Sequence, residues 1–184
     1  MPPEHTSSPA DLARRTVLTR MPVRSVAIDE RRAPFEAARW AYKPKPGQTV
    51  EQVWFCGVHS DVGGGYPIEE SGLSNIALQW MRDRAASAGL GIDPDVDATY
   101  PPRPDPMAAL HVSKKGLYRL TPGNDRVIGV AAEPTQQPDG TSSTRDPTQS
   151  LHPSVLTRWD RDPDYRPGNL RDYFRSIGDP RGEG

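Results

Sequence analysis

The feature that most constrains this chain is a nearly continuous apolar run at residues 53–58, VWFCGV, which stops at the glycine-rich sequence HSDVGGGYP. A short run of β-forming apolar residues is typical of a strand buried on both faces of a parallel sheet. Beyond the glycines, Ser74 offers an N-cap for an amphipathic helix that continues to about Ala88. The order of strand, loop and helix predicts an α/β fold with reactive side chains after the carboxyl end of a strand. Residues 59–67 themselves are expected to be a loop without regular structure.

The composition indicates that much of the chain lies outside a packed core. Only 34% of the residues are hydrophobic, mean hydropathy is -0.72, and the chain contains 21 prolines and 16 glycines. This hydrophobic fraction is below that of ordinary globular domains, and many prolines and glycines are typical of loops. We therefore expect a partly disordered N-terminal tail at residues 1–22, an ordered portion at 23–175 that contains a flexible loop at 133–150, and a disordered tail at 176–184. Short helices are expected at 10–20 and 33–40.

Charge and cysteine content exclude several classes of function. A net charge of -1, with basic and acidic residues interspersed, gives no basic face for nucleic acid. The single cysteine, Cys56, rules out an intramolecular disulfide and a multi-cysteine zinc site, and its apolar surroundings predict a buried thiol. We expect no cofactor. The N-terminus lacks an apolar signal core and no apolar stretch reaches the length of a membrane span, so the chain as encoded is expected to be cytoplasmic.

His59 is the strongest candidate for chemistry because it stands where the strand ends and the glycines begin. A neutral imidazole there could take a proton from a nucleophile and return it to a leaving group. Gly63, Gly64 and Gly65 would let the backbone approach a substrate closely. The alternative is structural: His59 caps the strand locally, and the glycines only make a tight turn.

The neighbours of His59 and the other histidines leave further alternatives open. Asp61 could orient His59 or satisfy amides of the glycine loop, and the second role is favoured because alternate side chains of an extended segment point apart. A metal site is not expected, since His59 and Asp61 are too few ligands. His152 is a competing catalytic candidate, but the Pro-Ser-Val after it reads as a helix start, which favours a structural role. His111 and His5 have weaker claims.

The run VWFCGVHSDVGGGYPIEESGLSNIALQWM resembles the histidine loop of an α/β-hydrolase family whose best-known members are type VI secretion phospholipase effectors. Two flanking pieces agree with that family. The first is VAIDERR at residues 26–32 with Phe35, and the second is LHPSV at 151–155 with YRPGNL at 165–170. The resemblance covers roughly residues 23–170 and leaves 130–150 unmatched.

The resemblance implies the C-terminal part of a three-layer α/β-hydrolase fold with an incomplete sheet and long irregular loops. It also implies that His59 is the general base, with Ser60, Asp61 and the three glycines as the loop around it. In the family, a serine in a GFSRG elbow and an aspartate in a WDTVG segment come before this histidine, which is the chain order of α/β-hydrolases. The present sequence contains neither a GxSxG elbow nor a WDTVG segment.

Two functions of different classes follow from this departure. In the first, the chain is a fragment of a serine ester hydrolase. A second chain supplies the aspartate and the serine, and the serine attacks an acyl ester of a phospholipid with His59 as its base. Antibacterial family members also imply an immunity protein and export by a type VI secretion system. In the second, the chain is a non-catalytic remnant or a partner-binding module, because half of a sheet leaves an unpaired edge.

Overall fold

The computed structural model describes residues 21–35, 37, 46–112, 123–136 and 142–183. The helix expected at 10–20 lies outside these residues. Of the helix expected at 33–40, Ala33–Phe35 forms the short 3-10 helix η1, and most of the remainder also lies outside them.

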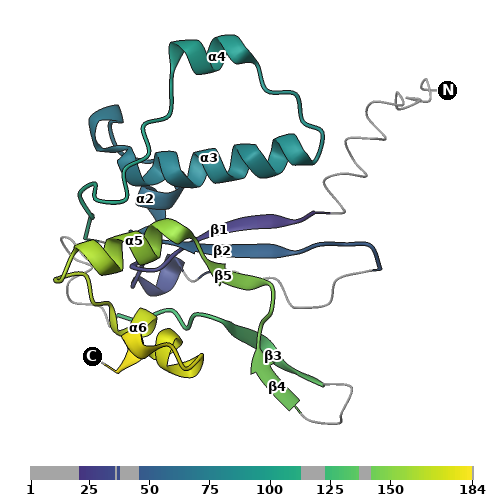
Figure 1. Cartoon of the computed structure of the whole chain (residues 1–184), viewed down its shortest axis with the longest axis vertical. Helices are drawn as coiled ribbons and strands as arrows, with labels where there is room; N and C mark the ends of the chain where they lie inside the picture. Colours follow the sequence, from purple (N-terminus) through teal and green to yellow (C-terminus); the bar gives the residue numbers. More distant parts are fainter. Residues whose placement is uncertain (1–20, 36, 38–45, 113–122, 137–141, 184) are drawn as a thin grey trace.

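The part of the chain that the structure describes has a parallel sheet of three strands in the order β1-β2-β5 (Figure 1). These strands are β1 (Val23–Ala27), β2 (Glu51–Phe55) and β5 (Gln149–Leu151). The central strand, β2, comes from the apolar run, and four of its five residues are buried, as a strand covered on both faces requires. The predicted α/β class with a partial parallel sheet is confirmed.

Helices lie on both sides of this sheet (Figure 1). The short helix α2 (His59–Gly63) follows β2 and leads through the 3-10 helix η2 (Ile68–Glu70) into α3 (Gly72–Ser87), which packs along β1. Helix α4 (Pro94–Thr99) stands away from the sheet beyond α3. The C-terminal part of the chain supplies α5 (Pro153–Arg161), α6 (Gly168–Ser176) and the 3-10 helix η4 (Pro180–Gly182).

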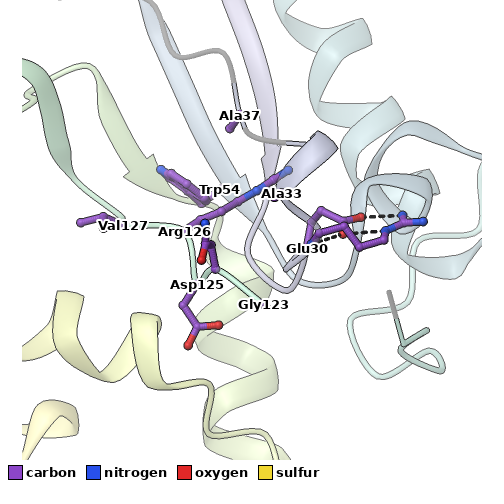
Figure 2. Close-up of a pocket in the computed structure, with 10 residues that line it drawn as sticks. Glu30, Ala33, Ala37, Trp54, Gly123, Asp125, Arg126 and Val127 are labelled. Carbon is purple, nitrogen blue, oxygen red and sulfur yellow. Dashed lines mark hydrogen bonds and ion pairs between the residues drawn. The ribbon is translucent and has the colours of Figure 1, made fainter. Parts of the chain in front are cut away.

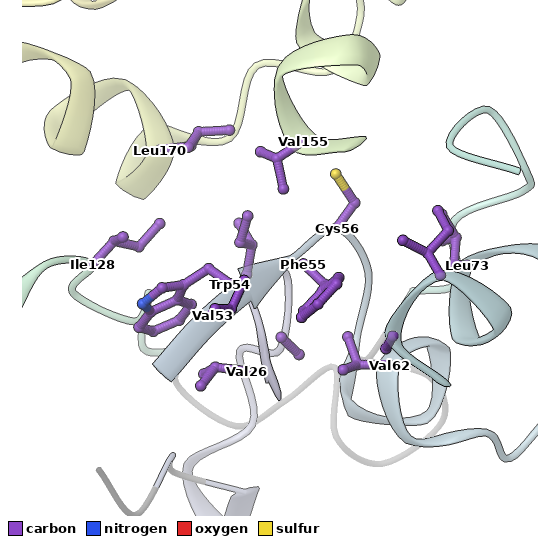
Figure 3. Packing of buried hydrophobic residues seen from close by; sticks show 14 of the residues in the cluster. Val26, Val53, Trp54, Phe55, Cys56, Val62, Leu73, Ile128, Val155 and Leu170 are labelled. Atoms are coloured by element: carbon purple, nitrogen blue, oxygen red, sulfur yellow. The ribbon is translucent and has the colours of Figure 1, made fainter. Parts of the chain in front are cut away.

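The core is built around β2, because alternate side chains of a strand point to opposite faces. Phe55 meets Trp80 of α3 edge to face, with 5.7 Å between the ring centres. Figure 3 shows Trp54 pointing toward Ile128, with Val155 and Leu170 on the same side. Val155 and Leu170 are completely buried. Cys56 is buried as predicted, and burial raises the pKa of its thiol to about 12.

Three segments differ from the sequence predictions. Residues 59–67 were expected to be irregular, yet they contain α2, because the Asp61 carboxylate accepts a hydrogen bond from the Val58 amide and closes the first turn. Residues 133–150 were expected to be a flexible loop, but the end of β3 (Val130–Gln136), β4 (Ser142–Arg145) and β5 lie there. Residues 176–184 were expected to be a disordered tail, but η4 packs against α6 and buries Gly182.

A buried polar cluster explains why the polar segment before α5 is ordered. The Gln149 side-chain oxygen accepts hydrogen bonds from the indole of Trp54 and from the Gly129 amide, both at 2.9 Å. Its amide nitrogen donates to the carbonyl of Val130 and to the buried carboxylate of Asp146. A polar residue therefore ties β5 to β2 and to the β3–β4 hairpin.

We predict that Gln149→Leu lowers the free energy of unfolding by about 3 kcal/mol, because buried donors and acceptors lose their partners. Gln79→Leu, the same change at an exposed position of α3, should alter it by less than about 0.5 kcal/mol. Urea denaturation of both variants measures the difference. Equal losses in the two variants would show that the Gln149 cluster contributes little.

Candidate functional site

The candidate site forms where β1 and β2 end together. The two strands are parallel and in register up to Ala27 and Phe55. The ladder continues one step further, since the Ile28 amide donates to the Phe55 carbonyl and the Asp29 amide donates to the Gly57 carbonyl. Glu30 and His59 follow directly on neighbouring strands. Residues that are 29 positions apart in the sequence are thereby brought into contact.

His59 lies in a pocket made of side chains from residues 30–35. Its Nδ1 atom is 2.6 Å from Oε2 of Glu30, and its ring stacks on Phe35 with 4.4 Å between ring centres. Its Nε2 atom lies 3.1 Å from the hydroxyl oxygen of Ser60. The His59 side chain is 38% exposed, whereas that of Glu30 is fully buried. One edge of the imidazole is therefore held by the protein, and the other reaches the surface.

Arg32 completes the surroundings of Glu30. Its guanidinium donates to both carboxylate oxygens, at 3.0 Å and 2.8 Å, in the ion pair drawn with dashed lines in Figure 2, and its backbone amide donates to Oε1 as well. Burial alone would raise the pKa of Glu30, but the hydrogen bonds from Arg32 and His59 outweigh it and lower the pKa to about 2. Glu30 is therefore a carboxylate at neutral pH.

Two cavities adjoin this pair. One of about 370 Å³ has a lining that includes Glu30, Arg32, Trp54, Asp125 and Arg126. Figure 2 shows Glu30 on one side of it and Trp54 and Arg126 on the other. The other, of about 210 Å³, runs along β1 and reaches His59. Its wall includes the apolar side chains of Val26, Ala27, Phe35, Ala37 and Val62.

Asp61 does not contact the imidazole of His59. One oxygen of this buried carboxylate accepts from the Val58 amide, and the other lies 2.6 Å from Nδ1 of His111. The His111 ring also stacks on Tyr66, with 3.5 Å between ring centres, and its Nε2 atom is 3.0 Å from Glu70. Asp61 and His111 thus join the glycine loop to the segment before residue 112.

The three glycines of the loop have different surroundings. Gly63 ends α2, and Gly64 follows it with a φ of 79°, the left-handed conformation that favours glycine after a helix. Gly65 lies against Ser60, whose Oγ would be 3.1 Å from a β-carbon at that position. The loop therefore folds back on the residue next to His59.

His152 occupies a different place from His59. The helix start predicted after His152 is confirmed. His152 is the N-cap of α5, and its Nδ1 atom accepts from the Ser154 amide at 3.2 Å. Its ring stacks on Phe55, and burial lowers its pKa. These contacts give His152 a capping and packing role.

Sequence reasoning missed Glu30 as a site residue. The signal was present in the charged sequence DERR directly after a strand, which was noted only as a resemblance. A carboxylate at the carboxyl end of one parallel strand and a histidine at the end of the next were the features that could have identified the pair.

Residues 12–84 match the sequence model of the family described as "T6SS, Phospholipase effector Tle1-like, catalytic domain". The matched segment contains Glu30, Arg32, Phe35 and the whole loop from His59 to Gly65. The resemblance noted from the sequence motifs is thus confirmed over these residues. No curated protein and no solved structure matches the chain. In the described residues, no helix is long and apolar enough to span a bilayer.

We predict that Gly57→Ala destabilises the site strongly, by about 3 kcal/mol or more, because strain and overpacking add at this position. Gly57 has a φ of 101°, and an added β-carbon would lie 2.4 Å from the β-carbon of Asp61. Gly63→Ala is the matched control, since nothing lies within 4 Å of its β-carbon position. Thermal unfolding should separate the two variants, and similar melting temperatures would contradict this account.

The His111 contacts predict a pH dependence of stability. Burial alone would lower the pKa of His111, but its contacts with Asp61 and Glu70 outweigh this and raise the pKa. The His111 contacts therefore stabilise the folded chain fully below about pH 6.5, the pKa of histidine in the unfolded chain. This stabilisation is lost as the pH rises through the higher pKa of His111 in the folded chain. The difference in unfolding free energy between the unmodified chain and His111→Gln should be larger at pH 6 than at pH 9. If the difference in unfolding free energy between the two proteins does not change with pH, this prediction is wrong.

Proposed function

We propose that this chain supplies the general base, His59, to a serine-dependent hydrolase that cleaves acyl esters of phospholipids. The observation that carries the proposal is the held imidazole at the end of β2, with Nδ1 on a buried carboxylate and Nε2 next to a hydroxyl. This is the orientation that a base needs in order to accept a proton from a serine. The match of residues 12–84 to the catalytic domain of phospholipase effectors supports the same assignment.

The reaction would proceed through an acyl-enzyme. A serine oxygen attacks the ester carbonyl carbon while Nε2 of His59 takes the serine proton. The tetrahedral intermediate then collapses, the ester C–O bond breaks, and His59 gives the proton to the departing lysophospholipid alcohol. A water molecule then attacks the acyl carbonyl carbon while His59 takes its proton. The bond between the acyl carbon and the serine oxygen breaks, His59 returns the proton to that oxygen, and the fatty acid leaves. Backbone amides near the serine would hold the oxyanion.

The serine of this scheme would come from outside residues 1–184. The sequence contains no GxSxG elbow, and we propose that a preceding segment or a second chain carries it, as the resemblance implies. Residues 23–175 would then be the C-terminal portion of an α/β-hydrolase domain. The cavity along β1 leads to His59 and has an apolar wall suited to an acyl chain.

The description of the matching family suggests the biological setting. A phospholipase effector of a type VI secretion system would be exported from the cell that makes it, and that cell would need an immunity protein to protect its own lipids. Both the export and the immunity protein are parts of this proposal.

The test is reconstitution with the protein encoded directly upstream of Met1. The two polypeptides are co-expressed, incubated with vesicles of phosphatidylethanolamine and phosphatidylglycerol, and assayed for released fatty acid by mass spectrometry. We predict that His59→Ala lowers kcat by about 10⁴-fold or more, the usual effect of losing a triad member. His152→Ala is the matched control, and it should keep most of the activity while losing about 1 kcal/mol of stability with its cap.

Two results would overturn the proposal. Unchanged fatty-acid release by the His59→Ala variant would remove the histidine from the reaction. Labelling of the chain alone by a fluorophosphonate, mapped to Ser60, would show that the nucleophile lies within this chain and not outside it. If no upstream reading frame with a GxSxG elbow exists and the chain releases no fatty acid, the non-catalytic alternative stands instead.

A further inference from the structure

The segment from Glu30 to Phe35 surrounds the imidazole of His59. Glu30 lies at Nδ1, Phe35 stacks on the ring face, and the Arg32 guanidinium lies over the Phe35 ring, 4.1 Å from its centre. All three side chains come from the eight residues after β1. Glu30, Arg32 and Phe35 therefore hold the His59 ring in one orientation.

The contacts of Nδ1 determine which tautomer His59 adopts. Nδ1 is 2.6 Å from Oε2 of Glu30 and 2.9 Å from Nη2 of Arg32. A carboxylate can only accept a hydrogen bond, and a guanidinium can only donate one. The shorter contact to the carboxylate places the proton on Nδ1, and Arg32 then donates to the same Glu30 oxygen at 2.8 Å. Nε2 is left with a lone pair, the form that a general base requires.

Glu30 is itself fixed in position. It is fully buried, and it accepts three hydrogen bonds from Arg32, two from the guanidinium and one from the backbone amide. Asp29, the residue before it, accepts from the Gly57 amide at 2.6 Å and from the Tyr165 hydroxyl. The two consecutive carboxylates therefore have different partners: Asp29 binds the backbone after β2, and Glu30 binds the imidazole of His59.

We infer that Glu30 is the positioning carboxylate of His59, and that it occupies the place for which the family resemblance assigns an aspartate outside this chain. The inference rests on the proposed function for its catalytic meaning, although the contact itself does not. A serine is then the only triad member that must come from elsewhere. As the imidazole gains a proton during the reaction, the Glu30 charge stabilises the imidazolium that forms.

The first test reads the imidazole directly in the full chain. Long-range ¹H–¹⁵N spectra of the ¹⁵N-labelled protein distinguish the two tautomers, and His59→Gln identifies the signals of His59. We expect the Nδ1–H tautomer, with a proton shifted far downfield by its bond to a carboxylate. Glu30→Gln should lose this proton and mix the tautomers, because an amide can turn either its oxygen or its nitrogen to Nδ1.

Two further variants serve as controls for the spectra. Glu69→Gln, the same change at an exposed position, should leave the His59 signals unchanged. Glu30→Asp keeps the charge but shortens the side chain, so it should restore part of the downfield signal. If Glu30→Gln does not fold, the spectra of the unmodified chain are sufficient as a test. An Nε2–H tautomer of His59 in those spectra would overturn the inference. Unchanged His59 signals in a folded Glu30→Gln variant would overturn it as well.

The second test uses the reconstituted enzyme and separates this inference from the proposed function. Glu30→Gln should lower kcat by about 10³- to 10⁴-fold with little change in KM, and change the pH dependence of kcat/KM. Replacing the WDTVG aspartate of the upstream protein by asparagine should have a much smaller effect. If His59→Ala loses activity but Glu30→Gln does not, the role inferred for Glu30 is wrong while the proposed function stands. If the spectra are as expected and His59→Ala stays active, the proposed function fails and the contact remains structural.

Discussion

The parallel pairing of β1 with β2 is the constraint on which the site depends. The register that sets Ala27 opposite Phe55 makes both strands end at the same edge, so Glu30 and His59 leave the sheet side by side. A shift of one residue would turn Glu30 to the opposite face, because side chains alternate along a strand. The 2.6 Å contact between the carboxylate and the imidazole is thus a consequence of strand register.

Buried polar contacts keep the ends of these strands in place. Asp29 and Asp61 both accept hydrogen bonds from backbone amides of the turn after β2, at Gly57 and Val58 respectively. Gln149 of β5 likewise bonds to Trp54 of β2 and to the β3–β4 hairpin. Since an unpaired buried carboxylate or amide is costly, each of these contacts favours a single arrangement of the chain. The site is therefore held by the same interactions that define the fold around it.

The proposed chemistry divides between this chain and another segment. The described residues contain the His59 imidazole and the Glu30 carboxylate at the carboxyl edge of the sheet, and a largely apolar cavity that runs along β1 to His59. The nucleophile would come from a separate segment. In this arrangement the base is positioned before the nucleophile is present, because Glu30, Arg32 and Phe35 come from the same chain as His59.

The sequence by itself determined the α/β class, the buried strand, the helix after it and the start of the helix at His152. These features follow from local patterns of apolar, glycine and capping residues. Only the tertiary structure decided which carboxylate meets which histidine. Asp61 is two residues from His59 yet pairs with His111, whereas Glu30 is distant in sequence and pairs with His59. Strand register and helix geometry set these pairings, and neither can be read from the spacing of residues along the chain.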